Sequence, residues 1–150
     1  MITKDFATHF AQDWIDSWNS HDLDRILSHY ADDFEFSSPF IITLMAEPSG
    51  TLKGKDNIKA YWTKGLERRP DLRFDLYKVT FGVDTLALHY NSETGRNAVE
   101  WFFFAADGRV VKSLAHHDEI ESVITKKVVG ENEKYSEVKY SEVKKLAKND

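Results

Sequence analysis

The chain has 150 residues, 41% of them hydrophobic and 13% aromatic, which is enough to bury one core and short for two domains. Its formal net charge of −5 argues against nucleic acid as the main partner, because phosphate binding needs a basic face. Cysteine is absent, which excludes disulfides, thiol catalysis and thiolate metal sites. The first ten residues hold no long apolar run, so we expect no signal peptide, no membrane span and a cytoplasmic location.

The first predicted element is an amphipathic helix over about residues 4–19. An aromatic side chain recurs at every fourth position from Phe6 to Trp18, and this spacing gathers the rings on one helical stripe. A second, short helix follows, for which Asp22 is the expected N-cap. From Asp33 the pattern is typical of a strand, which ends at a proline.

The rest of the chain divides into a mostly apolar segment, a third helix and a run of strands. The segment is 40–54, and the helix after it stops before Pro70, because proline disfavours helix in the preceding residue. Turn signals, including Asp107-Gly108, then separate four segments rich in β-forming residues: 72–81, 84–92, 97–105 and 109–118. Helices followed by an antiparallel meander predict the α+β class.

The stretch from Trp14 to Pro39, WIDSWNSHDLDRILSHYADDFEFSSP, resembles the start of the SnoaL-like and ketosteroid isomerase-like families. The resemblance lies in "DLD" at the second helix and "YADDFEF" before the strand, and it covers about residues 5–118. These families share the α+β cone of the nuclear transport factor 2-like superfamily. The resemblance therefore implies a cystatin-like α+β cone, with three N-terminal helices packed on a strongly curved antiparallel sheet around one apolar pocket.

We accordingly predict a cone domain over residues 1–120 and a charged extension over 121–150. The extension is rich in Lys and Glu, repeats YSEVK in tandem and lacks a core-forming pattern beyond a candidate edge strand at 123–129. Its last part is expected to be a solvated helix or disordered.

The resemblance also assigns roles to three positions. In ketosteroid isomerases a tyrosine on the first helix and a buried aspartate donate hydrogen bonds to the substrate oxyanion, and an aspartate before a proline is the base. Alignment places Trp14 at the tyrosine, Ser38 at the base and Glu100 at the buried acid. Serine cannot abstract a carbon-bound proton unaided, so steroid isomerisation by that mechanism is not expected.

Glu100 also attracts attention on chemical grounds alone, because it lies in the run VEWFFF among apolar and aromatic neighbours. Burial there would raise its pKa unless the carboxylate is paired. A neutral carboxylic acid can donate a hydrogen bond to a developing oxyanion, as the buried aspartic acid of ketosteroid isomerases does. The alternative is a structural glutamate satisfied by an Arg or His on the next strand.

His116, His117 and Asp118 end the last predicted strand and are the other catalytic candidates. Alternation places His116 and Asp118 on one face and His117 on the other. Asp118 resembles the general base of SnoaL-like cyclases, whereas the isomerase alignment directs His117 into the cone. A bulge at this strand end would reconcile the two frames, and a solvent-facing polar strand end is the alternative.

The expected ligand is a small, mainly apolar molecule with a ketone or enol, because the candidate wall residues are mostly rings. A phosphate-bearing ligand would need a cationic cluster, and the chain offers only scattered Arg73, Arg96 and Arg109. We predict no metal and no cofactor, since the six histidines form no HExxH pattern and no nucleotide fingerprint occurs. The predicted ligand-binding residues are Trp14, Trp18, Tyr30, Phe36, Ser38, Tyr61, Trp62, Phe74, Tyr90 and Phe102.

Three functions fit these observations. The first is an isomerase, cyclase or dehydratase-like enzyme that uses acid/base proton transfer without a cofactor. The second is a non-catalytic module that binds a hydrophobic ligand, and the third is a dimeric interaction domain. We expect a homodimer in each case, because a sheet covered on one face would leave Trp101 and Phe103 in water.

Overall fold

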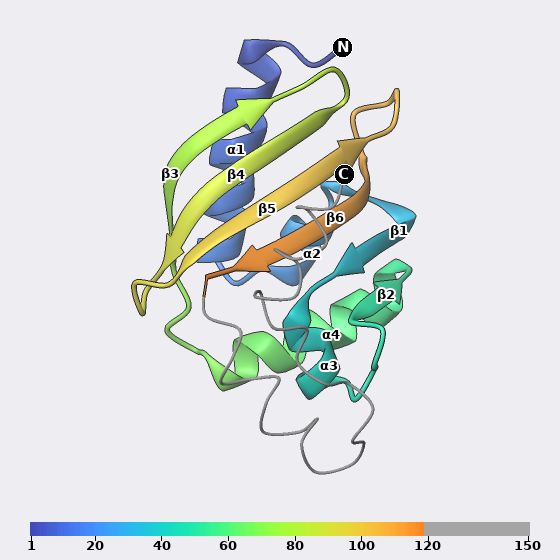
Figure 1. The fold of residues 1–150 in the computed structure, drawn as a ribbon, viewed down its shortest axis with the longest axis vertical. Helices are drawn as coiled ribbons and strands as arrows, with labels where there is room; N and C mark the ends of the chain where they lie inside the picture. The colour runs from blue at the N-terminus through green and yellow to red at the C-terminus, as the bar shows by residue number, and fades with distance from the viewer. Residues whose placement is uncertain (119–150) are drawn as a thin grey trace, which may run out of the picture.

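The computed structural model describes residues 1–118, in which four helices surround one face of a six-stranded sheet (Figure 1). The predicted edge strand at 123–129 and the charged extension lie outside these residues. The helices are α1 (Lys4–Asn19), α2 (Leu23–Leu27), α3 (Pro39–Leu44) and α4 (Lys55–Arg68). The strands are β1 (Tyr30–Ser37), β2 (Thr51–Lys53), β3 (Phe74–Phe81), β4 (Thr85–Ser92), β5 (Asn97–Phe104) and β6 (Val110–His117).

The sheet is curved and unclosed, with the strand order β2-β1-β6-β5-β4-β3. Strands β3 to β6 form the predicted antiparallel meander. The strand before Pro39, whose pairing the sequence left open, is β1, and it pairs with β6 in parallel. Between β1 and β6 the chain forms β2, α4 and the earlier strands of the meander, and this connection is long enough for parallel pairing.

Helix α1 forms where the aromatic periodicity predicts it. Thr3 caps its first turn, accepting from the backbone N–H of Phe6 at 3.2 Å. The rings at positions 10, 14 and 18 are buried against the concave side of the sheet. The Asp22 cap is confirmed, since one carboxylate oxygen accepts from the backbone N–H groups of Asp24 and Arg25, at 3.0 Å each.

The number of helices differs from the three predicted, because a short helix, α3, begins directly after β1. Ser38 caps it by accepting from the backbone N–H of Phe40 at 3.3 Å, and Pro39 occupies the first turn. A proline fits there because the first helical N–H groups have no partner within the helix. The proline that ends the strand therefore also starts a helix, and the apolar run after it becomes one wall of the pocket.

The core lies between α1, the concave face of β3–β6 and α4. It is dominated by rings: Trp14 stacks on Phe74 with centroids 5.8 Å apart, and Trp18 meets Trp62 edge to face at 5.2 Å. The α+β cone with a ring-lined concave side is thus confirmed for the part of the chain described.

Of the helices within residues 1–118, none combines the length and apolar character needed to span a bilayer.

Candidate functional site

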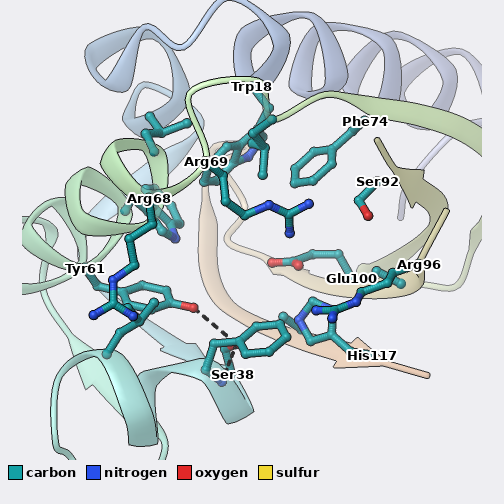
Figure 2. Close-up of a pocket in the computed structure, with 18 of the residues that line it drawn as sticks. Trp18, Ser38, Tyr61, Arg68, Arg69, Phe74, Ser92, Arg96, Glu100 and His117 are labelled. Carbon is teal, nitrogen blue, oxygen red and sulfur yellow. Dashed lines mark hydrogen bonds between the residues drawn. The ribbon is translucent and has the colours of Figure 1, made fainter. Parts of the chain in front are cut away.

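A pocket of about 320 Å³ enters the cone between the sheet and the helices α3 and α4 (Figure 2). Its mouth is formed by α3, the C-terminal end of α4, the turn between β4 and β5, and the end of β6. Its deepest side chains are fully or nearly buried and come from α1, β4 and β5: Trp14, Tyr90 and Glu100. The pocket is therefore open to solvent at one end and lined by rings at the other.

Ten of the fourteen predicted site residues line this pocket. They come from both helices and strands, which the curvature of the sheet brings around one cavity. The ten are Trp14, Trp18, Phe36, Ser38, Tyr61, Trp62, Phe74, Tyr90, Glu100 and His117.

Glu100 lies at the base of the cavity with 3% of its surface exposed. Ser113 on β6 donates its hydroxyl to Glu100 Oε1 at 2.5 Å, and Tyr90 on β4 donates to Oε2 at 3.4 Å. Burial raises the pKa of Glu100 from 4.5 to about 7, although both hydrogen bonds oppose the rise by favouring the ionised form. At neutral pH this carboxyl group is thus present in both its acid and its base form.

The tyrosines around Glu100 remain protonated at neutral pH. Burial, followed by the charge of Glu100, raises the pKa of Tyr30 and of Tyr90 well above the usual range. Burial also raises the pKa of Tyr61 to about 12, with Glu100 as a smaller cause. The phenols of Tyr61 and Tyr90 are therefore hydrogen-bond donors in the pocket wall, and neither can act as a base there.

His117 lines the pocket from the end of β6, with its ring 4.4 Å from that of Phe40. Burial lowers its pKa from 6.5 to about 4, with the charges of Arg96, His116 and Arg69 acting in the same direction and Asp118 opposing them. The imidazole is consequently neutral at neutral pH, when one ring nitrogen can donate a hydrogen bond and the other can accept one.

Ser38 occupies the position that the isomerase alignment gives to the base, but its hydroxyl is used structurally. It caps α3 and accepts from the Tyr61 hydroxyl at 3.3 Å. With 4% of its surface exposed, it contributes a polar edge to the pocket wall. The geometry gives Ser38 no neighbouring base among its hydrogen-bond partners, in agreement with the expectation that it does not abstract a proton from carbon.

Four predicted site residues do not line the pocket. Tyr30 and Phe102 are buried in the core behind it, where Trp14 Nε1 donates to the Tyr30 hydroxyl at 2.9 Å. His116 is exposed, because strand alternation turns it away from the side occupied by Ala115 and His117. Asp118 is exposed and accepts from the backbone and side-chain N–H groups of Asn97, at 3.1 and 2.8 Å.

The bulge that would have turned His116 and Asp118 inward is not present at the end of β6. Pairing with β5 is continuous from Ala98 opposite His117 to Phe103 opposite Lys112, and the register shifts only beyond Phe103. Only His117 and Glu100 among the four predicted catalytic residues therefore reach the pocket.

Sequence reasoning missed two groups of residues. The first is Ser113. Strand alternation puts it on the same inward face as Ala115, but its hydrogen bond with Glu100 depends on the register between β5 and β6. The second is a set of arginines at the mouth: Arg68 and Arg69 end α4, and Arg96 lies in the turn between β4 and β5 (Figure 2). The Arg-Arg-Pro sequence at the end of a predicted helix was the available signal for the first two.

The arrangement can bind a mainly apolar body and exchange one proton with it. Rings enclose the body, Glu100 supplies an acid or a base, and His117 supplies a neutral hydrogen-bonding group. Within residues 1–118, no three His, Cys, Asp or Glu side chains form a group that could hold a metal ion.

Residues 11–113 match the family model described as a SnoaL-like domain. A SnoaL-like protein of unknown function from Burkholderia thailandensis is 52% identical in sequence, with a TM-score of 0.76 over 79% of this chain and 98% of that one. No curated protein matches the sequence.

More distant structures share the fold alone. An NTF2-like protein of unknown function from Burkholderia pseudomallei is 17% identical, with a TM-score of 0.62 over 79% of this chain and 95% of that one. TerC co-crystallised with polyporic acid is 14% identical, with a TM-score of 0.64 over 78% of this chain and 95% of that one.

Proposed function

The chain belongs to the SnoaL-like domain family, and from that premise we propose that it is a small-molecule enzyme that moves a proton on an apolar, oxygen-bearing ligand. The reaction class is isomerisation, cyclisation or dehydration without a cofactor. The observation that supports this proposal is Glu100, an ionisable group at the base of a ring-lined cavity whose pKa is raised to about 7. An acid or base is most effective when its pKa lies near the working pH.

The proposed step begins with the ionised form of Glu100. The carboxylate accepts a proton from a carbon next to the ligand carbonyl, and the electron pair of the broken C–H bond forms the enolate. Glu100 then returns the proton to a different carbon, which gives the isomer. In a cyclisation, the enolate carbon instead attacks a second carbonyl carbon of the same ligand, the C=O π bond breaks, and Glu100 returns the proton to the resulting alkoxide. In the isomerisation, atoms and charge are unchanged overall, and no co-reactant is consumed.

Hydrogen-bond donors around the cavity would stabilise the enolate oxygen. The neutral His117 imidazole lines the pocket from the end of β6, whereas the single O–H of Tyr61 already donates to Ser38. The indole N–H of Trp18 is a further candidate, because it is buried and has no acceptor within residues 1–118. We assign His117 to this role in preference to that of a base, since a pKa of about 4 makes it a weak one.

Exchange of the α-protons of a simple ketone for deuterium tests the proposal, and the natural substrate need not be known. In deuterated buffer, the protein should accelerate loss of the α-proton NMR signals of 2-tetralone, an apolar ketone of suitable shape. Glu100→Gln keeps the size of the side chain and removes the base, so it should abolish the acceleration. Glu35→Gln is the matched control, because Glu35 pairs with Lys112 at 2.8 Å on the surface and does not line the pocket.

A non-catalytic binding module is the second candidate, and one observation favours it. Both oxygens of Glu100 already accept a hydrogen bond from a neighbouring hydroxyl, as expected of a structural carboxyl group. In that case 2-tetralone would bind, and neither the protein nor Glu100→Gln would accelerate exchange. That result would contradict the proposed enzyme while retaining the pocket.

A further inference from the structure

The two hydroxyl groups that contact Glu100 come from different surroundings. Figure 2 shows the Glu100 carboxylate directed into the cavity. Ser113 on β6 is fully buried, does not line the pocket, and donates to Oε1 at 2.5 Å. Tyr90 on β4 lines the pocket and donates to Oε2 at 3.4 Å. Oε1 is therefore held by a residue of the core, whereas Oε2 contacts a residue of the pocket wall.

The two hydrogen bonds also differ in strength. The Ser113 bond has the short length of a charge-assisted hydroxyl–carboxylate contact. The Tyr90 bond, at 3.4 Å, is longer than the range of about 2.5–3.0 Å that is usual for O–H···O. The Tyr90 bond is consequently the weaker one, and Oε2 is the oxygen better placed to exchange a proton with a ligand.

The ring of Tyr90 is fixed by two other rings and by the sheet. Its centroid lies 4.6 Å from that of Phe74 and 5.4 Å from that of Trp14. Tyr90 lies opposite Ala98 on β5, two positions from Glu100, and side chains at such diagonal positions can reach one another on one face. The phenol oxygen is thus held beside Oε2, and only its hydroxyl proton has to turn for Tyr90 to change its acceptor.

Proton transfer would move the negative charge away from Glu100. When Oε2 accepts a proton from the ligand carbon, the carboxylate becomes neutral, and the electron pair of the C–H bond places the charge on the enolate oxygen. A hydroxyl donates more strongly to an anionic oxygen than to a neutral one. The best acceptor for Tyr90 is therefore Oε2 before the transfer and the enolate oxygen after it.

We propose that Glu100 exchanges the proton through Oε2, that the Tyr90 hydroxyl passes its hydrogen bond from Oε2 to the enolate oxygen, and that Ser113 holds Oε1 throughout. Tyr90 is then a catalytic residue, and Ser113 is a positioning residue. No covalent bond of Tyr90 changes, because burial raises its pKa well above the usual range and the phenol keeps its proton. This inference rests on the proposed function of the pocket, and it adds the residue that follows the charge.

The geometry also narrows the class of substrate. In a carbonyl compound, the oxygen and the adjacent carbon that loses a proton are separated by one atom, so they can lie against two protein oxygens 3.4 Å apart. Tyr90 and Glu100 lie at the deepest part of the pocket, so the carbonyl end of the ligand enters first. The substrate is therefore an enolisable carbonyl compound whose apolar remainder extends along the rings toward the mouth.

Tyr61 is the other phenol of the pocket wall, and its contacts do not suit this task. Its hydroxyl donates to Ser38 at 3.3 Å. Ser38 is not ionised, so this bond does not weaken when Glu100 accepts a proton. Tyr90 is thus the phenol whose hydrogen bond depends directly on the charge of Glu100.

Tyr90→Phe tests the transfer of the hydrogen bond, with deuterium exchange into 2-tetralone as the assay. The variant keeps the ring that packs on Phe74 and Trp14 and removes only the hydroxyl. At a pH where Glu100 is ionised, kcat should fall on the order of 100-fold, as expected for the loss of one oxyanion donor. The KM should change less than about threefold, because the contact with the ligand oxygen forms only as charge develops. A retained KM also shows that the pocket is intact.

Ser113→Ala removes the other hydroxyl bond to Glu100 and separates positioning from catalysis. Both bonds favour the ionised form of Glu100, so loss of either should move the midpoint of the pH profile of kcat/KM upward from about 7. Ser113→Ala should lower the limiting kcat less than about tenfold, since the remaining base is stronger. Tyr77→Phe is the matched control, because it removes a hydroxyl from a side chain that is 79% exposed, and it should match the wild type in both measurements.

The outcomes separate this inference from the proposed function. A wild type that does not accelerate exchange would contradict the proposed enzyme, and the role of Tyr90 with it. An active wild type with the same limiting kcat in Tyr90→Phe would overturn the role of Tyr90 alone. Equal losses of kcat in Tyr90→Phe and Ser113→Ala would also overturn it, since both residues would then only position Glu100. A raised KM with an unchanged kcat in Tyr90→Phe would identify Tyr90 as part of the wall only.

Discussion

Glu100→Gln should make the protein more stable, and the gain should depend on pH. The folded state raises the pKa of Glu100 from 4.5 to about 7 because burial disfavours the charged form. Between these two values the folded protein holds a proton that the unfolded chain has released. Raising the pH through this range therefore stabilises the unfolded state relative to the folded one.

The magnitude follows from the two pKa values. The increase from 4.5 to about 7 corresponds to about 3 kcal/mol of folding stability, which is present below pH 4.5 and lost by pH values above 7. Glutamine does not titrate, and it can still accept from Ser113 and contact Tyr90. The variant should therefore unfold about 10 °C above the wild type near pH 8, and at a similar temperature at acidic pH.

Thermal unfolding of both proteins across this pH range, followed by circular dichroism, measures the difference. All other titrating groups contribute equally to the two proteins and cancel in the comparison. Glu35→Gln removes only a surface ion pair with Lys112, so its effect should stay within about 1 kcal/mol. A Glu100→Gln difference that is independent of pH, or that grows toward acid, would refute the raised pKa of Glu100 and its role as acid and base.

Three further predictions concern the surroundings of the pocket. Tyr30→Phe leaves the indole N–H of Trp14 buried without its acceptor, so denaturant unfolding should show a loss of about 1–3 kcal/mol, whereas Tyr77→Phe at an exposed position should have no effect. The folded state lowers the pKa of His117 from 6.5 to about 4, so the wild type should lose stability relative to His117→Gln as the pH falls through that range; an NMR titration midpoint near 6.5 would contradict this. We propose a homodimer formed through the convex face of the sheet, where 40% of Trp101 is exposed; light scattering should give twice the monomer mass, and Trp101→Glu should give the monomer mass, whereas a monomeric wild type would contradict the proposal.

Much of the fold could be predicted because its signals are local in the sequence. The ring at every fourth position of α1, the Asp22 cap and the Asp-Gly hairpin each depend on residues within a few positions of one another. The burial of Glu100 was also predictable, since alternation in an apolar strand fixes which side chains share a face. Helix α3 was missed because a proline after a strand was interpreted as an interruption alone, although it also suits the first turn of a helix.

The sequence by itself determined the α+β class, the ring-lined concave side and the presence of one acid among apolar neighbours, because periodicity and hydrophobicity act over a few residues. Only the tertiary structure decided what that acid contacts and what surrounds the pocket mouth. Ser113 meets Glu100 through the register of two strands, and Arg69 approaches Arg96 because the curved sheet brings a turn toward the end of a distant helix. Such contacts depend on the packing of whole elements, and residues far apart in the chain carry no local pattern that reveals them.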